Sequence, residues 1–331
     1  MSALVARFPQ LAHTLAHVDL RVSETPVERW TVNGVSLLAK RDDLSAPLLG
    51  GNKVRALELL LASVATGDTI LTVGATGSTH ALAVAEYARS LGAKCEVITW
   101  PQETNAVSRA TSARLRSIAR VTSAGSVATA YLRAAVRRSG RRVTWVPAGG
   151  SVALGAIGHV NAALELVDQL QRDDVPMPHT IVVPLGSGGT VAGMMVGLSL
   201  AGAKTRVVGV RVVPSAVANR WRILRLARQT RMLLSRLANE ELPPIDVSCL
   251  EIDQGAYGGA YGRETHDGRT AASALRAAGG PRLDGTYSAK AFSSALRRAR
   301  LEPDERVLFW LTFDGRWLAA DDEGPIGESD G

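Results

Sequence analysis

The sequence has few of the features that stabilise small secreted proteins or carry a chain across a membrane. Only two of its 331 residues are cysteines, Cys95 and Cys249, which is too few for a disulfide framework and suits a reducing compartment. No apolar run approaches the roughly 20 residues of a membrane-spanning helix. The N-terminal residues also lack the apolar core of a signal peptide. We therefore expect a cytoplasmic protein with no membrane partner.

Aromatic residues are also scarce, at 5% of the chain, although the formal net charge is +7. The basic residues are mostly arginines on segments with a helical pattern. This combination favours solvated helix faces and small anionic ligands over a nucleic-acid surface. Nothing resembles the residue spacing of a zinc site or the residue order of a Ser-His-Asp hydrolase, so we expect no metal ion and no acyl transfer.

What the sequence does contain is a series of short β-branched runs that alternate with helical patterns. Hydrophobic residues make up 46% of the chain, enough for one large core or for two lobes. The runs are apolar throughout, which predicts strands covered on both faces, and helices are expected at 79–91 and 190–201. Both cysteines also lie in segments that read as buried strands. The predicted strands are 68–75, 95–100, 142–150, 180–189, 205–213 and 306–311. The alternation predicts an α/β fold with parallel sheets.

Two segments stand apart from this alternation. Residues 219–241 have a basic amphipathic pattern, with Trp221 and Met232 among the apolar residues available for one face. We expect a solvated helix packed on the sheet there, in preference to a membrane or nucleic-acid surface. Residues 319–331 are polar and are expected to form a mobile tail.

The clearest local signal is a glycine-rich turn between a strand and a helix, formed by Gly186, Ser187, Gly188, Gly189 and Thr190. Glycines let successive backbone N–H groups converge on one point, and the following helix N-terminus adds its positive dipole, so such a turn can bind a phosphate. The third glycine of a dinucleotide fingerprint and the Gly-Lys-Ser/Thr end of a Walker loop are both absent. The segment is either a monophosphate cradle or a tight turn without a ligand.

A second glycine-rich turn opens the helix expected at 79–91. Ser78, Thr79 and His80 would place hydroxyl groups and unpaired backbone N–H groups at one helix start, which can receive a carboxylate. The alternative is that Ser78 or Thr79 is a plain helix cap and that His80 is a packed residue.

Lysine and tyrosine side chains complete the set of candidates. Lys53 follows two glycines and Asn52 at the start of a helical pattern, and Tyr261 and Tyr287 lie in glycine-containing loops. A lysine at a helix start, a phosphate cradle far downstream and a hydroxyl-rich helix start between them suggest pyridoxal 5'-phosphate. The aldehyde of that cofactor needs a lysine, and its phosphate needs a concave set of N–H groups.

These motifs occur in an order that resembles a known enzyme family. They are similar to the ordered motifs of the D-cysteine desulfhydrase and 1-aminocyclopropane-1-carboxylate deaminase family, within the tryptophan synthase β-like, fold type II pyridoxal phosphate enzymes. The resemblance extends from about residue 37 to 317. The matching motifs are KRDDL (40–44), GGNKVRALE (50–58), GATGSTH (74–80), GGSVALGAIGHV (149–160), GSGGT (186–190), AYGRET (260–265) and LDGTYSAKA (283–291).

The resemblance implies an architecture and an assembly. We expect two three-layer αβα domains with mostly parallel sheets. A large cofactor-binding domain would consist of residues 1–56 plus 157–331, and a small inserted domain would consist of residues 57–156. The substrate, a small amino acid, would bind in the cleft between them, and the protein would form a homodimer.

The resemblance also implies roles for individual residues. Lys53 would bind the cofactor covalently and later move the Cα proton of the substrate, with Ser78, Tyr261 and Tyr287 as the other catalytic residues. The residues expected to contact the substrate are Ser78, Thr79, His80, Tyr261 and Tyr287. The residues expected to contact the cofactor are Asn52, Lys53, Thr79, Gly186, Ser187, Gly188, Gly189, Thr190, Ser288 and Thr312.

The sequence departs from the family pattern close to these motifs. Thr79 and Val152 stand where the family has asparagines, and Phe313 and Asp314 stand where it has glycines that let the chain approach the cofactor ring. Ser288 stands where the cyclopropane-opening deaminases resemble one another in having a glutamate opposite the pyridine nitrogen. A hydroxyl at that position favours β-elimination over ring opening.

The function that the resemblance implies is a pyridoxal phosphate-dependent lyase. It would abstract the Cα proton of a small amino acid and eliminate a β-substituent, as a D-cysteine desulfhydrase does, to give a keto acid and ammonia. Three alternatives stay open. They are ring opening of 1-aminocyclopropane-1-carboxylate, β-replacement on an unusual amino acid in a specific pathway, and a non-catalytic binding protein that keeps the cofactor fold.

Overall fold

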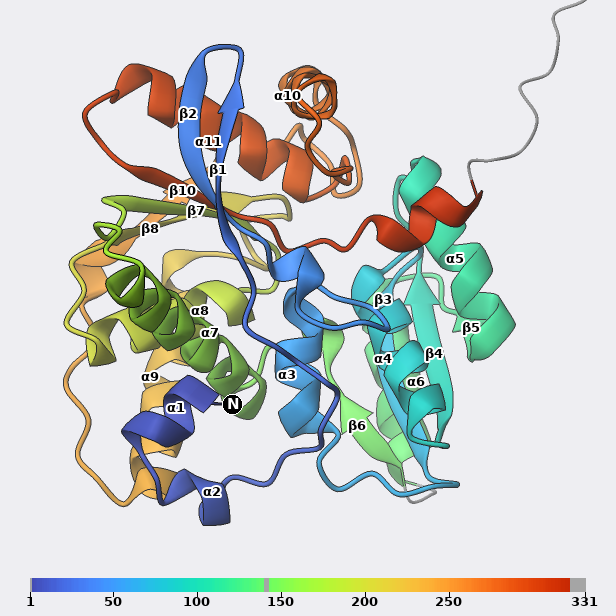
Figure 1. The fold of residues 1–331 in the computed structure, drawn as a ribbon. Helices are drawn as coiled ribbons and strands as arrows, with labels where there is room; N and C mark the ends of the chain where they lie inside the picture. Colours follow the sequence, from blue (N-terminus) through green and yellow to red (C-terminus); the bar gives the residue numbers. More distant parts are fainter. Residues whose placement is uncertain (1, 140–142, 322–331) are drawn as a thin grey trace, which may run out of the picture.

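The computed structural model describes residues 2–139 and 143–321, which form two β-sheets, each covered by helices on both faces (Figure 1). We call the part around the six-stranded sheet the large lobe and the part around the four-stranded sheet the small lobe. The strands of the large lobe, in their order across the sheet, are β1 (Val27–Val32), β2 (Val35–Lys40), β10 (Val307–Trp310), β7 (Thr180–Leu185), β8 (Arg206–Arg211) and β9 (Leu250–Asp253). The strands of the small lobe, in the same sense, are β5 (Arg120–Ser123), β4 (Lys94–Trp100), β3 (Thr69–Ala75) and β6 (Thr144–Val146).

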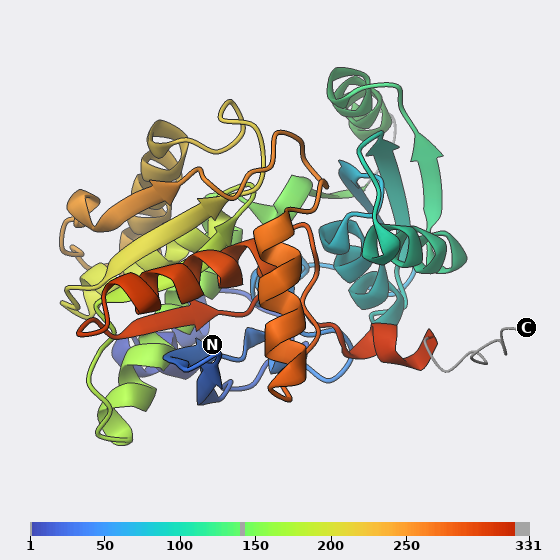
Figure 2. The same cartoon turned by 90° about the horizontal axis from the view of Figure 1, so that it is seen from above.

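The helices lie in layers on both faces of each sheet (Figure 2). Those of the large lobe are α1 (Ser2–Arg7), α2 (Leu11–Thr14), α7 (Ala153–Arg172), α8 (Gly189–Leu200), α9 (Arg220–Ala238), α10 (His266–Ala277) and α11 (Ser288–Leu301). Those of the small lobe are α4 (Thr79–Ser90), α5 (Ala106–Ile118) and α6 (Val127–Ser139), and α3 (Asn52–Leu60) lies between the lobes. Four short 3-10 helices are η1 (Asp42–Leu44), η2 (Ala148–Gly150), η3 (Val247–Cys249) and η4 (Arg316–Asp321).

The α/β class predicted from the sequence is confirmed. All strand pairs within the described residues are parallel except β1 with β2, which pair antiparallel with Val27 opposite Lys40. The helices α10 and α11 cover one face of the large sheet, and α7 and α8 cover the other face. In the small lobe, α4 and α5 lie on one face of the sheet and α6 lies on the opposite face. Each lobe is therefore a three-layer αβα unit with its own core.

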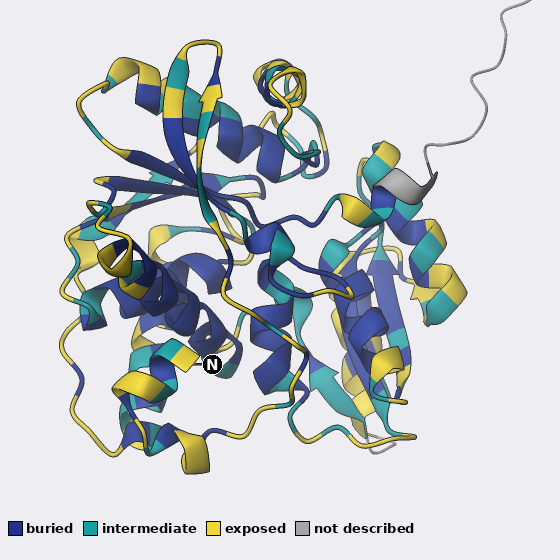
Figure 3. Ribbon diagram, viewed as in Figure 1, coloured by how far each residue is buried: buried dark blue, intermediate teal, exposed yellow. Residues whose placement is uncertain are grey.

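The apolar strands and the central helices are the most buried elements (Figure 3). Helix α8 is buried along almost its whole length, as expected for a helix that is apolar on all sides. Its glycines let α7 approach closely, because a Cβ atom at Gly193 would lie 2.4 Å from the carbonyl oxygen of Ala156. The close approach fixes the start of α8, where the glycine-rich turn ends.

Several sequence-based expectations need correction at the level of single elements. The strands β1, β2 and β5 were not predicted, since they contain polar and charged residues and lie at or near sheet edges. Cys249 belongs to η3 and is half-buried, so the strand near it begins one residue later, at Leu250. Part of the strand expected at 142–150 falls on residue 142, which lies outside the described residues.

Helix α9 was expected from its amphipathic pattern, with Trp221, Leu224, Met232 and Leu237 available for one face. Leu224 and Leu237 pack against the core beside the buried Ile223, Leu226 and Leu234, whereas Trp221 and Met232 are exposed. Across residues 2–139 and 143–321, no helix combines the length and the apolar composition that a membrane span would need.

The described chain ends against the small lobe. Residues 316–321 form η4, in which Trp317 packs against the core of the small lobe, and the guanidinium of Arg114 lies 5.5 Å from its ring centroid. Of the tail predicted at 319–331, residues 322–331 lie outside the described residues.

The domain boundaries after residues 56 and 156 stay a prediction, and both fall inside helices, α3 and α7.

A buried group of ion pairs holds α3 in place. The Arg55 guanidinium donates to Asp42 at 2.7 Å and to Glu165 of α7 at 2.9 Å, and Lys40 lies 2.8 Å from Glu165. Burial opposes ionisation of Glu165, but Arg55 and Lys40 outweigh that effect and lower the pKa of Glu165 to about 2. A Cβ atom at Gly158 would lie 2.0 Å from the carbonyl oxygen of Arg55, so α3 and α7 pack with their backbones close together.

We predict that Arg55→Ala costs about 3–5 kcal/mol of unfolding free energy, because it leaves the buried Asp42 carboxylate without its cationic partner and Glu165 with Lys40 alone. Denaturant unfolding followed by circular dichroism measures this loss. The matched control is Arg172→Ala, which removes an exposed pair with Glu24 and is expected to leave stability nearly unchanged. Equal stability of the two variants would contradict the account.

Candidate active site

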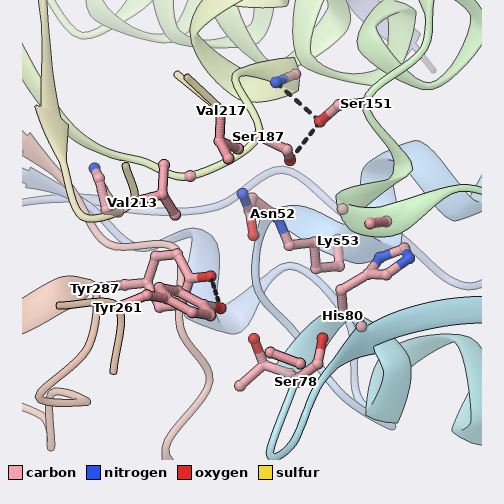
Figure 4. A pocket seen from close by; sticks show the side chains of 18 of the residues that line it. Asn52, Lys53, Ser78, His80, Ser151, Ser187, Val213, Val217, Tyr261 and Tyr287 are labelled. Atoms are coloured by element: carbon pink, nitrogen blue, oxygen red, sulfur yellow. Dashed lines mark hydrogen bonds between the residues drawn. The ribbon is translucent and has the colours of Figure 1, made fainter. Parts of the chain in front are cut away.

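A cavity of about 890 Å³ lies between the two lobes. Its walls come from the start of α3, the ends of β3 and β7, the N-termini of α4 and α8, and the loops that carry Tyr261 and Tyr287 (Figure 4). These elements are far apart in the sequence. Since the carboxyl ends of parallel strands are where α/β folds bind ligands, the position agrees with the general rule for such sheets.

Lys53 projects into this cavity from the first turn of α3 (Figure 4). The preceding turn needs glycine, because Gly51 has a φ of 96° and a Cβ atom there would lie 2.5 Å from the carbonyl oxygen of Thr312. Burial of the ammonium group lowers the pKa of Lys53 to about 8. The amine therefore has a substantial neutral fraction close to neutral pH, which a base or nucleophile requires.

Two neutral histidines accompany Lys53. His80 of α4 lies with Nε2 3.3 Å from Thr72 Oγ1, and His159 of α7 lies with Nε2 3.5 Å from Thr190 Oγ1. Burial, reinforced by the charge of Lys53, lowers the pKa of each histidine to about 3. Both imidazoles are therefore uncharged at neutral pH and do not add positive charge beside the amine.

The glycine-rich turn has the geometry of an anion cradle. Gly188 adopts the left-handed φ of 93° directly before α8, and a Cβ atom at Gly189 would lie 2.7 Å from Ser151 Oγ. Ser151 Oγ in turn accepts from Gly189 N–H at 3.1 Å and lies 2.6 Å from Ser187 Oγ. The backbone N–H groups, the hydroxyls and the helix dipole meet at one point, so the turn fits a phosphate.

Asn52 links the cradle to the lysine. Its side-chain amide donates to Thr190 Oγ1 at 2.8 Å, and it immediately precedes Lys53 in the chain. A phosphate site and a reactive amine are thus held at a fixed separation by one hydrogen bond. This pair of features fits pyridoxal phosphate, which carries its aldehyde and its phosphomethyl group on adjacent carbons of one rigid ring.

The start of α4 forms the small-lobe wall of the cavity. Ser78 is the N-cap, and its hydroxyl accepts from Ala81 N–H at 3.2 Å, so the capping role considered for it is present. Ser78, Thr79 and His80 also line the cavity. The free N–H groups and the dipole of α4 make this wall suitable for a carboxylate.

The two tyrosines reach the cavity from the large lobe. Their hydroxyl groups are hydrogen-bonded to each other, and both phenols are half-buried. Burial raises the pKa of Tyr261 to about 12 and that of Tyr287 above its ordinary value. Both hydroxyls therefore keep their protons at neutral pH. Asp284 fixes the start of α11 by accepting from the N–H groups of Thr286, Tyr287 and Ser288.

The segment after β10 closes the cavity next to the Lys53 turn. Phe313 pairs with Gly51 in an isolated bridge, and Asp314 accepts from Gly50 N–H at 2.8 Å and binds Arg316. The glycine turn is thus braced by the backbone of Phe313 and by the side chain of Asp314. Thr312, Phe313 and Asp314 all line the cavity.

The lobes are also tied together on the tyrosine side. Arg263 binds Glu103 in a bidentate pair, with distances of 2.6 Å and 3.0 Å, and Asn105 of the small lobe donates to Thr286 at 3.1 Å. These contacts connect the loop that carries Tyr261 to the small lobe.

All the site residues predicted from the sequence line one cavity, with the exception of Ser288. Ser288 is fully buried at the start of α11 and is not among the lining residues. Sequence reasoning missed Ser151, His159, Asp284 and Asp314. Ser151 and His159 lie within the quoted motif at 149–160, but only their tertiary contacts reveal a link to the cradle.

The chain is similar to a known protein family and to several known enzymes. The family model described as pyridoxal-phosphate dependent enzyme matches residues 18–312. The chain is 31% identical to a D-cysteine desulfhydrase from Serratia proteamaculans, over 92% of this chain and 93% of that protein. It is 33% identical to the nocardicin C-9' epimerase of Nocardia uniformis subsp. tsuyamanensis, over 91% of this chain and 94% of that protein.

A solved structure agrees with both sequence matches. A homologue of 1-aminocyclopropane-1-carboxylate deaminase superposes with a TM-score of 0.77 at 26% identity, with 95% of each chain covered. The family match, the cradle and the lysine agree with one another. The chain therefore belongs to the family of pyridoxal-phosphate dependent enzymes and has their fold type II architecture.

Proposed function

We propose that this enzyme abstracts the Cα proton of a small amino acid and eliminates a β-substituent, which gives a keto acid and ammonia. The observation that carries the proposal is that a lysine amine of lowered pKa, a phosphate cradle and the N-terminus of α4 face one cavity. The 31% identity to a D-cysteine desulfhydrase over most of the chain supports the same class of reaction.

Residues of both the cradle and the Lys53 turn would hold the cofactor. The turn Gly186–Thr190 would bind the phosphate, and Asn52, Thr79 and Thr312 would contact the rest of the cofactor. When bound, pyridoxal phosphate would accept the electrons that remain at Cα after proton removal. Lys53 would hold the cofactor covalently, and its free, neutral Nζ would accept the Cα proton.

The remaining residues orient the substrate and complete the elimination. The N–H groups and hydroxyls at Ser78 and Thr79 bind the substrate carboxylate, which the α4 dipole favours. The Cα–H electron pair forms a double bond to Cβ as the β-substituent leaves with its bonding pair. The hydroxyl pair of Tyr261 and Tyr287 donates a proton to that leaving group. Water then converts the unsaturated amine to the keto acid and ammonia.

Epimerisation at Cα is a second candidate, because two protonated phenols and Lys53 approach the pocket from different sides (Figure 4). An epimerase removes the Cα proton on one face and returns a proton on the other. The 33% identity to nocardicin C-9' epimerase supports this alternative. Lys53 would remove the proton, and Tyr261 or Tyr287 would supply its replacement.

We also propose a cytoplasmic homodimer in which residues 57–156 form the inserted small domain. Two free cysteines, Cys95 and Cys249, support a reducing compartment, and the family resemblance supports the assembly. Light scattering on the purified protein measures its mass, and a monomer would overturn the proposed assembly.

The elimination is tested with a panel of D- and L-cysteine, D- and L-β-chloroalanine and 1-aminocyclopropane-1-carboxylate. We predict equal amounts of keto acid and ammonia from at least one β-substituted amino acid. Lys53→Ala is expected to lower the rate by about 100-fold or more, because it removes the base. It should also lose the covalent attachment of the cofactor, seen in the visible absorption spectrum.

The matched control for that panel is Lys204→Ala, which removes an exposed lysine outside the cavity and should keep full activity. Bound cofactor with no product from any compound would reject elimination. Product from the cyclopropane compound alone would assign ring opening in its place.

The two candidate reactions are separated by running the same panel in heavy water. For an eliminating enzyme we predict keto acid without accumulation of the opposite enantiomer. For an epimerase, the antipode would appear with deuterium at Cα. Loss of the donor phenol, by Tyr261→Phe or Tyr287→Phe, would abolish inversion while proton exchange by Lys53 continues. Chiral chromatography with mass spectrometry measures both products.

A further inference from the structure

We propose that the mouth of the cavity is a second binding subsite, which takes a large apolar group that ends in an anion and that the substrate carries beyond its reacting carbons. This inference rests on the proposed reaction and changes its substrate, from a small amino acid to one that carries a large group beyond its reacting carbons. The cavity of about 890 Å³ lies near the upper end of the roughly 300–1,000 Å³ found for sites of drug-sized ligands. The subsite therefore extends the site that holds the cofactor and the amino-acid group.

Three exposed apolar side chains form its walls. Val127 and Tyr131 of α6, on the small lobe, are 48% and 40% exposed, and Val217, in the connection between β8 and α9 on the large lobe, is 43% exposed. All three line the same cavity as Lys53. Apolar side chains that face solvent from both sides of a cleft mark a binding surface, because in a closed core they would be buried.

The small-lobe wall is held rigid by neighbouring aromatic rings. The Tyr131 ring stacks on that of Trp100 with a centroid distance of 6.3 Å, and it meets Trp145 edge-on at 6.4 Å. A wall that is already ordered loses little conformational freedom when a ligand packs against it. The arrangement suits a flat apolar or aromatic group.

A positively charged side chain, Arg222, also lines the cavity. It lies in the first turn of α9 and is exposed. Within residues 2–139 and 143–321, no carboxylate forms an ion pair with it. The acidic residues of the cavity wall have other partners, since Glu103 pairs with Arg263, Asp314 pairs with Arg316, and Asp284 accepts from backbone N–H groups. An unpaired guanidinium beside apolar walls complements a carboxylate at the end of an apolar group.

Burial raises the pKa of the Tyr131 phenol, and the positive charge of Arg222 opposes that rise. Arg222 therefore acts on a residue of the opposite lobe, so the cation and the aromatic wall belong to one subsite. The cofactor phosphate is the alternative anion for Arg222, because the neighbouring residue, Ile223, packs near Gly188 of the phosphate cradle. The experiment distinguishes these two anions.

The test uses the holoenzyme and two ligands that lack a β leaving group, O-(carboxymethyl)tyrosine and its neutral isostere O-(carbamoylmethyl)tyrosine, each as D and L forms. Alanine serves as the small reference. Titration calorimetry measures the dissociation constants. We expect both tyrosine derivatives to bind more tightly than alanine, and the acid to bind about tenfold more tightly than the amide, as for a hydrogen bond to a charged group.

The variants assign that preference to one side chain. Arg222→Gln should abolish the preference for the acid over the amide, and Tyr131→Ala should weaken both derivatives relative to alanine. The matched control is Arg225→Gln, since the Arg225 guanidinium lies over the Trp221 ring, 5.4 Å from its centroid, and does not line the cavity. This control should keep the preference. Cofactor affinity is measured for each variant by equilibrium dialysis.

Three results would overturn the proposal. They are equal affinities for the acid and the amide in the unmodified enzyme, weaker binding of both derivatives than of alanine, and an Arg222→Gln variant that loses cofactor and all ligands equally. The last result would assign Arg222 to the cofactor phosphate. Because these ligands cannot undergo elimination, the outcome does not depend on the proposed reaction, which the keto acid panel tests separately.

Discussion

The buried ion pairs of Arg55 are the interaction on which the geometry of the active site depends. Arg55 lies two residues after Lys53 on α3 and binds Asp42 and Glu165 at the same time. Any rotation or slide of α3 would break a charged contact in a place that water does not reach, and such a break is costly. The same helix belongs to both lobes, since Leu57 packs in the small-lobe core and Leu59 in the large-lobe core. The position of the lysine is therefore set by the whole fold.

Burial has opposite consequences for the two cations of this helix. Arg55 keeps its charge because two carboxylates compensate its desolvation, whereas Lys53 has no carboxylate partner and its pKa falls to about 8. The neighbouring histidines are neutral, and the nearest helix N-termini carry partial positive charge. A site with this balance suits anionic groups at its two ends, a phosphate at α8 and a carboxylate at α4, and leaves the amine between them partly neutral. The chemistry of the site thus follows from which buried charges have partners.

Much of this arrangement could be predicted from the sequence, because the motifs are local. The turn at 186–190, the cap at Ser78 and the glycine turn before Lys53 are each predicted from a few adjacent residues, because glycines and hydroxyls act directly on the local backbone. The contacts that join these motifs are long-range, and no local pattern reveals them. Asp314 braces Gly50 across 264 positions of the chain, and Asn52 reaches Thr190 across 138.

The errors have physical causes of the same kind. The buried face of α9 was assigned from hydrophobicity alone, yet Trp221 lies outside because a large ring and a guanidinium can cover each other on the surface. Ser288 was expected at the cofactor by motif position; it is fully buried and its N–H donates to Asp284, and its contact with the cofactor stays a prediction. Strand pairing at the sheet edges depends on neighbours, so polar strands such as β1 and β5 carry little signal of their own.

The central claim is that the folded chain alone, through burial, makes Lys53 a partly neutral amine. The most direct measurement is an NMR titration of the apoenzyme with isotope-labelled methyl groups on its lysine amines, with the Lys53 signal assigned by its absence in Lys53→Ala. The account predicts a midpoint near pH 8 for Lys53, well below the ordinary lysine value of about 10.4. A Lys53 midpoint at that ordinary value would contradict it.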